Sequence, residues 1–179
     1  MPEKRSVGLL VFTHLPSGEL VTILQRRGKF NDETMGPESY PGGCQLTVWG
    51  SAKDGETFDE ALDREIGEEA GGSWLADFWI ARYESKMAVH LEDPDVSGGN
   101  ISAWTIYLPA KKIEKLALGP ATGGIDPITE EKLPYIQDLE ASYTRESGVR
   151  NLEIIAMFND AKDILKKGFA WAKTLTPES

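Results

Sequence analysis

The stretch from residue 50 to residue 72 constrains this chain most, because it combines a well-marked helix with an unusual placement of acids. Thr57 followed by Glu60 forms a capping box, in which the Thr57 hydroxyl accepts from the third helical amide and the Glu60 carboxylate returns to the cap. No proline interrupts the following residues, and two consecutive glycines supply the left-handed conformation that ends many helices. The pattern predicts a helix from Phe58 to Ala70.

The acids of this helix fall on its apolar side. At about 100° per residue, the apolar residues of the first turn project into the same sector as Glu65, Glu68 and Glu69. Carboxylates spaced in this way repel by roughly 3 kcal/mol per pair at an effective dielectric of about 20. Arg64 lies about 100° around the helix from Glu65, so we expect it to pair with at most one edge of the cluster. Ligation by oxygen alone suits hard cations, so the cluster predicts Mg²⁺, with Mn²⁺ as its substitute.

The residue spacing through this stretch resembles the signature of the Nudix hydrolases. The matching positions are Gly50, Glu56, Arg64, Glu65, Ile66, Glu68, Glu69 and Gly71. A chance match of these positions is on the order of one in a billion per starting residue, given average usage of glycine and charged residues. Gly72 departs from the pattern, which has an aliphatic residue there, and the departure leaves the packing of the helix end open. The resemblance implies an α/β/α sandwich with a mixed β-sheet.

The resemblance also implies a role for each signature residue. The metal ligands would be Glu65, Glu68 and Glu69, with the main-chain carbonyl of Trp49 or Gly50. Arg64 and Glu56 would orient the acids by hydrogen bonding. Ile66 would pack beneath them, and Gly71 belongs to the same signature.

The general base stays open, because Nudix proteins use either a signature glutamate or a carboxylate shortly before a late strand. The candidates are Glu65, Glu68 and Glu146. Three other acids, Asp126, Glu130 and Glu131, compete with Glu146 for the position outside the signature, and no sequence pattern chooses among them.

Three cations are candidates for binding phosphate. Arg26 and Arg27 follow a predicted strand, where they would either grip phosphate oxygens bidentately or solvate the end of the strand. The resemblance favours phosphate, since Nudix proteins commonly place basic residues near this strand. Lys53 lies in the loop before the helix and could reach a phosphate, although such lysines are more often only solvated.

Composition limits the partners and the compartment. The 179 residues correspond to one domain, with residues 119–151 expected to shape a substrate pocket, and the net charge of -10 argues against nucleic acid or anionic membranes as partners. The single cysteine, Cys44, excludes an internal disulfide, and no apolar run approaches the length of a membrane span. We therefore expect a cytoplasmic protein. Because dimers are common among Nudix proteins, a homodimer stays open.

Apolar and β-branched runs predict the strands of the core sheet. These runs cover residues 7–13, 20–25, 45–49, 78–83, 101–108 and 152–158. A long loop is expected at residues 28–43. Asn159 is expected to cap a final amphipathic helix. Its core-facing residues would be Ile164, Leu165, Phe169, Ala172 and Leu175.

The leading functional hypothesis is Mg²⁺-dependent hydrolysis of a nucleoside diphosphate linked to another moiety. Bound metal would neutralise the diphosphate and activate a water for in-line attack, and a glutamate would take the proton. ADP-ribose, nucleotide sugars and nucleoside triphosphates all remain open as substrates. One alternative is a module that binds a nucleotide diphosphate without cleaving it. Another is an isopentenyl diphosphate isomerase, which needs a cysteine closer to the helix than Cys44.

Overall fold

The computed structural model describes residues 4–31, 34–116 and 122–175, so parts of the predicted loop 28–43 and of the segment 119–151 lie outside the described residues. Within these ranges, no helix has both the length and the apolar character that crossing a bilayer requires.

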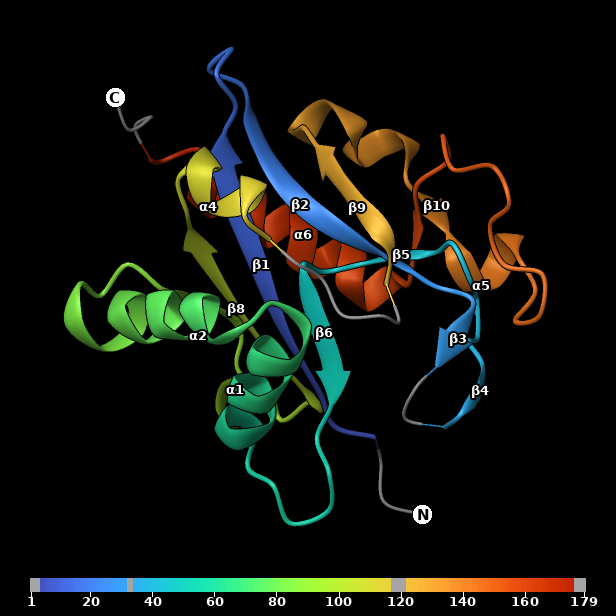
Figure 1. The fold of residues 1–179 in the computed structure, drawn as a ribbon, viewed down its shortest axis with the longest axis horizontal. Coiled ribbons are helices and arrows are strands. Elements are labelled where there is room, and N and C mark those ends of the chain that lie inside the picture. Colours follow the sequence, from blue (N-terminus) through green and yellow to red (C-terminus); the bar gives the residue numbers. More distant parts are fainter. Residues whose placement is uncertain (1–3, 32–33, 117–121, 176–179) are drawn as a thin grey trace.

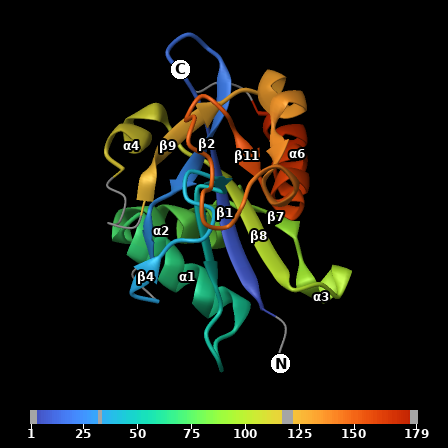
Figure 2. The ribbon, with the colours of Figure 1, turned by 90° about the vertical axis from the view of Figure 1, so that its right-hand side faces the viewer.

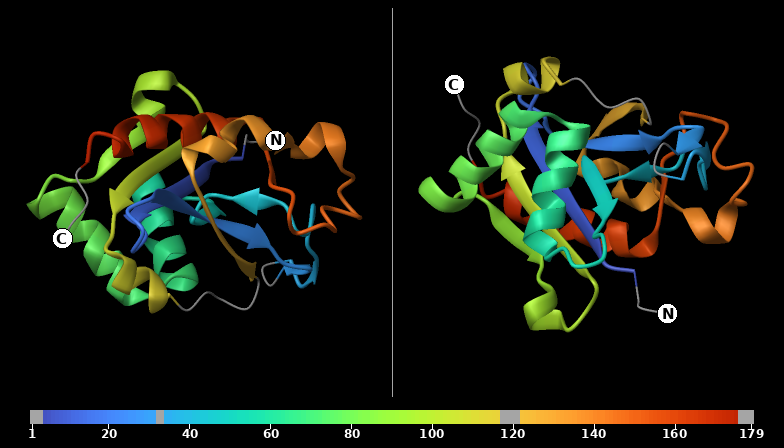
Figure 3. Two further views of the ribbon diagram at one scale, coloured as in Figure 1. Left: turned by 90° about the horizontal axis from the view of Figure 1, so that it is seen from above. Right: turned by 60° about the horizontal axis from the view of Figure 1, so that its bottom comes forward.

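A mixed β-sheet lies between two helical layers (Figures 1 and 2), as predicted. Its strands are β1 (Ser6–His14), β2 (Leu20–Arg27), β5 (Cys44–Gln45), β6 (Val48–Ser51), β7 (Val89–Glu92), β8 (Ile101–Tyr107) and β9 (Thr122–Ile128). Helices α1 (Phe58–Glu69) and α2 (Gly72–Trp79) cover one face, and α6 (Asn159–Ala172) covers the other (Figure 3).

Shorter elements decorate this sandwich. They are β3 (Phe30–Asn31), β4 (Gly36–Pro37), a π-helix (Ile80–Glu84), α3 (Pro94–Ser97), α4 (Ala110–Glu114), a 3-10 helix (Glu130–Tyr135), β10 (Gln137–Asp138), α5 (Leu139–Ser142) and β11 (Ala156–Met157). The pair β3–β4 falls inside the predicted loop 28–43, and β10 pairs with β11 in parallel.

The sheet splits where β1 and β2 diverge. These two strands pair only near their connecting turn, and farther along β6 pairs with β1 while β5 pairs with β2. Thr47, between β5 and β6, bridges the split, because its buried hydroxyl donates to the carbonyl of Ile23 and accepts from the amide of Val11 at 3.0 Å. The inserted segment brings Trp49 and Gly50 next to α1.

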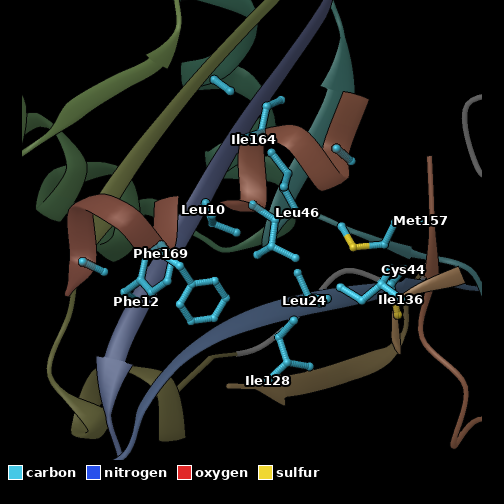
Figure 4. Packing of buried hydrophobic residues seen from close by; sticks show 14 residues of the cluster. Leu10, Phe12, Leu24, Cys44, Leu46, Ile128, Ile136, Met157, Ile164 and Phe169 are labelled. Carbon is cyan, nitrogen blue, oxygen red and sulfur yellow. The ribbon is translucent and has the colours of Figure 1, made fainter. Parts of the chain in front are cut away.

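Alternating residues of β1 fill the cores on the two faces of the sheet. Val7, Leu9 and Val11 pack with α1 and α2, whereas Leu10 and Phe12 pack with α6 (Figure 4). All five side chains are fully buried, which explains why residues 7–12 of β1 carry no polar side chain.

The predicted strand at residues 78–83 is wrong. This segment continues α2 and then forms the π-helix. Its aromatic and β-branched composition favours a strand, but Trp74 and Phe78 lie four residues apart and are both buried in the α1 core. Helical spacing of buried aromatics therefore prevails over composition.

Other predicted strands are shorter than expected or are interrupted. The run 45–49 is divided between β5 and β6, and the run 152–158 contributes only the two residues of β11. Asn159 is the first residue of α6 and does not cap it, since Phe158 occupies the cap position without a side-chain bond. The predicted core residues of this helix are buried, and Leu175 is half-buried beyond its end.

Candidate active site

Helix α1 begins and ends within one residue of the prediction. The Glu60 amide donates to Thr57 Oγ1 at 3.1 Å, and the Thr57 amide donates to Glu60 Oε2 at 3.2 Å, which completes the capping box. Gly71 follows the helix with φ +97°, a conformation that L side chains rarely adopt. Ile66 is fully buried in the core beneath the helix, as the resemblance implied.

The Glu65 side chain is buried against the backbone of Gly50. Its residue is only 4% exposed, and its carboxyl group lies over Gly50 of β6. A Cβ at residue 50 would lie 2.1 Å from Glu65 Cδ, so only glycine leaves room for this carboxylate. Gly50, which opens the signature, therefore determines where the Glu65 carboxylate lies.

The other two acids differ in exposure. Glu69 is half-buried, and its Oε2 accepts the amide hydrogen of Trp49 at 3.1 Å. The Glu68 side chain is 54% exposed. Two of the three carboxylates thus face the sheet as predicted, and Glu68 faces solvent beside them.

Arg64 contacts two of the three cluster acids and the loop acid Glu56. Its Nε and Nη2 donate to the two carboxylate oxygens of Glu56 at 2.8 and 2.9 Å, and its Nη1 reaches Glu65 at 2.9 Å and Glu68 at 3.2 Å. Nη2 also donates to the carbonyl of Ser51 at 3.0 Å. Arg64 thus pairs with one edge of the cluster, Glu65 and Glu68, as predicted, whereas Glu69 accepts from the Trp49 amide.

These contacts shift the pKa of both members of the central ion pair. The hydrogen bonds from Arg64, followed by the Lys53 amide, lower the pKa of Glu56 from 4.5 to about 2. Hydrogen bonding to Glu56 likewise raises the pKa of the Arg64 guanidinium. Both groups therefore stay charged at neutral pH, and the orienting roles implied for Arg64 and Glu56 have a geometric basis.

The potential metal ligands around helix α1 are all oxygen atoms, which suits a hard divalent cation. Glu65, Glu68, Glu69 and the carbonyls of Trp49 and Gly50 offer only oxygen, on one helix face and the adjoining strand. Within the described ranges, no three His, Cys, Asp or Glu side chains converge closely enough to hold a metal ion. The guanidinium of Arg64 instead bridges Glu65 and Glu68 and also binds Glu56.

Arg26 is a structural cation and does not serve the predicted phosphate contact. It is 3% exposed and forms an ion pair with Asp126 of β9. Its remaining donors reach the main-chain carbonyls of Gly42, Leu152 and Ile154. Every side-chain nitrogen is therefore used inside the protein, so Arg26 has none to offer a phosphate.

The other predicted phosphate ligands differ from each other. Arg27 is half-buried, pairs with Glu38 at 3.0 Å and donates to the carbonyl of Ser39 at 2.8 Å, which ties β2 to the loop beyond β4. Lys53 is exposed in the loop before α1, and its amide donates to Glu56 Oε1 at 2.6 Å. Among the two, Lys53 is the one that lies beside the acid cluster.

The carboxylates proposed outside the signature lie elsewhere. Glu146 is exposed in the turn between α5 and β11, and in Figure 1 this turn lies at the right-hand edge of the molecule, whereas α1 lies to the left of β6. Asp126 is engaged by Arg26, and Glu130 pairs with Lys173 at 3.0 Å. The structure does not bring Glu146 to the acid cluster, because the chain after α5 returns beside loop 40–43 instead.

Cys44 does not have the environment of a reactive cysteine. Its residue is 1% exposed, and burial raises the pKa of its thiol to about 12. The thiol is therefore neutral at physiological pH and packed in the α6 core, which removes the cysteine that an isomerase would require.

Sequence reasoning missed a row of side chains on the α1 face of the sheet. Gln25 of β2 pairs with Gln45 of β5 on one side and with Ile125 of β9 on the other. The available signal was a polar residue at the end of the apolar run LVTILQ. Its partners could not be identified, because the register of three separate strands brings them together.

The protein shares its fold with solved Nudix structures. No family model and no curated protein matches the chain. A MutT/nudix family protein from Listeria innocua is 18% identical, with a TM-score of 0.55 over 97% of this chain and 96% of that one. A NUDIX hydrolase from Alicyclobacillus acidocaldarius is 13% identical, with a TM-score of 0.51 over 100% and 99% of the two chains.

A third structure extends beyond the part that matches. A MutT/nudix family protein from Enterococcus faecalis is 15% identical, with a TM-score of 0.50 over 97% of this chain, which spans 65% of that protein's length. At these identities the likeness concerns architecture. The three layers, the split sheet and the acid-bearing helix together give this chain the Nudix-type fold.

Proposed function

We propose that this protein hydrolyses the diphosphate bond of a nucleoside diphosphate linked to another group, with Mg²⁺ as cofactor and Mn²⁺ as substitute. The observation that carries the proposal is the Glu65 carboxyl group, which is buried over Gly50 where no side chain other than hydrogen fits. Burial of an acid is costly without a compensating charge. A single arginine among four carboxylates leaves the site negatively charged, and this favours a divalent cation.

The residues that would hold Mg²⁺ are Glu65, Glu68, Glu69 and the carbonyl of Trp49 or Gly50. When bound, the ion would offset the charge of the diphosphate and lower the pKa of a coordinated water. ADP-ribose, nucleotide sugars and nucleoside triphosphates are the substrate classes to test.

The chain's own residues supply orientation and proton transfer. Arg64 holds Glu65 and Glu68 through one guanidinium nitrogen, while Glu56 fixes the other side of the guanidinium. Glu68 is the most exposed of the three cluster acids, so we assign to it the proton released by the attacking water. Lys53 would attract the substrate phosphates from the adjoining loop.

The test is a Mg²⁺-dependent screen of diphosphate compounds with products identified by mass. Glu68→Gln should lower turnover by about 100-fold or more, the scale of a lost general base. Asp63→Asn is the matched control on the opposite side of α1, where Asp63 accepts a hydrogen bond from Trp79 Nε1 at 3.0 Å. Full activity of the Glu68→Gln protein on every active substrate would remove Glu68 from the mechanism.

A second function, binding without turnover, has one observation in its favour. Arg64 pairs with Glu56, Glu65 and Glu68, so a cation of the chain itself already holds three of the four carboxylates. Saturable binding of a nucleotide diphosphate, with no product formed in either Mg²⁺ or Mn²⁺, would favour that function over hydrolysis.

A further inference from the structure

The row formed by Gln45, Gln25 and Ile125 crosses three adjacent strands on the side of the sheet that carries α1. Leu24 packs with α6, and the Arg26 side chain donates to the carbonyl of Ile154 on that same side of the sheet. Gln25 lies between them in β2 and therefore projects to the opposite face. Strand pairing then places Gln45 and Ile125 on either side of Gln25, on that same face.

A chain of hydrogen bonds orients the two amides. Arg27 Nη1 approaches Gln45 Oε1 at 3.4 Å, and an arginine can only donate, so the facing atom of Gln45 is its oxygen. Gln45 Nε2 then donates to Gln25 Oε1 at 3.0 Å. This order directs the Nε2 group of Gln25 away from Gln45.

The side-chain Nε2 group of Gln25 has N–H donors that make no hydrogen bond in the described residues. The residue is only 5% exposed, yet within the described residues no acceptor takes a hydrogen from Gln25 Nε2. Gln25 Nε2 is not among the fully buried atoms without a partner in the described residues, so it reaches the surface, where a ligand or water can accept its hydrogens. Beside it, Ile125 is 39% exposed and offers an apolar surface.

The row lies within reach of the acid cluster. Gln45 precedes Trp49 by four residues, and an extended chain of that length spans at most about 14 Å. Trp49 in turn contacts Glu69. A ligand whose diphosphate lies at the cluster could therefore extend its nucleoside along β5 toward Gln25.

We propose that Gln25 binds the nucleoside half of the substrate, donating from Nε2 to an oxygen or ring-nitrogen acceptor while Ile125 packs against the nucleoside. The inference rests on the proposed function for the identity of the ligand, but it concerns binding and not turnover. The Arg27 and Gln45 side chains act as positioning residues, because they fix which end of the Gln25 amide faces the ligand.

The test measures binding by calorimetry, with Mg²⁺ present, of α,β-imido analogues of UDP, GDP and ADP and of imidodiphosphate without a nucleoside. Gln25→Met should weaken binding of at least one nucleoside analogue by about two- to tenfold, the value of a single hydrogen bond, and leave imidodiphosphate unchanged. Gln25→Glu keeps the shape but replaces the donors, so it should weaken the same analogue. Gln137→Met, at an exposed position of β10, is the matched control and should change the binding of neither ligand.

Binding of ribose 5-phosphate identifies the acceptor. If Gln25→Met weakens this ligand too, the acceptor is on the sugar; if only base-containing ligands are weakened, it is on the base, and both results support the proposal. Equal losses for imidodiphosphate and the nucleoside analogues, or no loss at all with the fold intact by circular dichroism, would overturn it.

This outcome is separable from that of the proposed function. A wild-type protein that binds the analogues through Gln25 but cleaves no diphosphate would refute hydrolysis alone. A protein that cleaves diphosphates and is insensitive to the Gln25 variants would refute only the nucleoside contact.

Discussion

Residue 50 must be glycine because the Glu65 carboxyl group lies against it, and not because its φ angle is positive. It is absent from the residues with positive φ, whereas the space above its Cα is filled by the Glu65 carboxyl group. The position therefore acts on the site by sterics alone.

We expect Gly50→Ala to lower Mg²⁺-dependent turnover by about 100-fold, since an active-site acid displaced by about 1 Å can cost that much. The added methyl group would also destabilise the fold by about 1–3 kcal/mol. Steady-state kinetics and urea unfolding measure the two effects. Gly72→Ala is the control, because a Cβ there meets nothing within 4 Å; equal activity of the two variants would contradict the steric role.

The Glu56–Arg64 pair predicts a defined acid sensitivity. Because the pKa of Glu56 is lowered from 4.5 to about 2, its ionised form stabilises the fold above pH 4.5, and this stabilisation is lost as the pH falls toward 2. The free energy of unfolding should therefore differ between wild type and Glu56→Gln at pH 7, with the difference shrinking across this window. Urea unfolding at several pH values measures it, and a difference that is constant with pH would contradict the assignment.

At the scale of elements, two helices use glycine in opposite ways. Gly67 of α1 faces open space, whereas a Cβ at Gly168 of α6 would lie 2.6 Å from Leu10 Cδ2 and 2.9 Å from Phe12 Cε2. The second glycine allows α6 to approach β1 closely.

Alanine at these two positions should change stability in opposite directions. Gly67→Ala should stabilise the fold by up to about 1 kcal/mol, the helix-propensity gain over glycine. Gly168→Ala should destabilise it by about 1–3 kcal/mol, because overpacking against β1 exceeds that gain. Paired thermal and urea unfolding test this, and a stabilised Gly168→Ala protein would show that α6 can move away from the sheet without loss.

Elements with local signals were predictable, and those defined by distant partners were not. The capping box and the residues after Ala70 set α1 to within a residue. Residues 78–83 have the composition of a strand but continue α2 as helix, because Trp74 and Phe78 both reach the core only at helical spacing. Residues 122–128 form β9 only because β2 offers an edge for pairing.

At the scale of the molecule, Arg26 joins four separate parts of the chain. It connects β2 to Asp126 of β9 and to the carbonyls of Gly42, Leu152 and Ile154. The buried guanidinium thus holds the late segment against the split sheet.

Removing the Arg26 guanidinium should lower the stability of the fold more than it changes the activity. Arg26→Met leaves Asp126 and three carbonyls without their donor, so we expect a loss of about 3–5 kcal/mol in the free energy of unfolding. KM of the folded variant for its substrate should stay near the wild-type value. Arg27→Met is the comparison, with a smaller loss from a half-buried site; a raised KM in a stable Arg26→Met protein would restore the phosphate-binding interpretation.

The sequence by itself determined helix α1 and the spacing of its acids, because both depend on neighbours within a few residues, and the resemblance of that stretch to the Nudix signature implied the class of fold. Only the tertiary structure decided which partner each charge meets. It directed Arg64 to both Glu65 and Glu68, buried Arg26, and carried Glu146 away from the cluster. Those contacts depend on strand register and on where the chain returns, and both are set by packing between residues far apart in sequence.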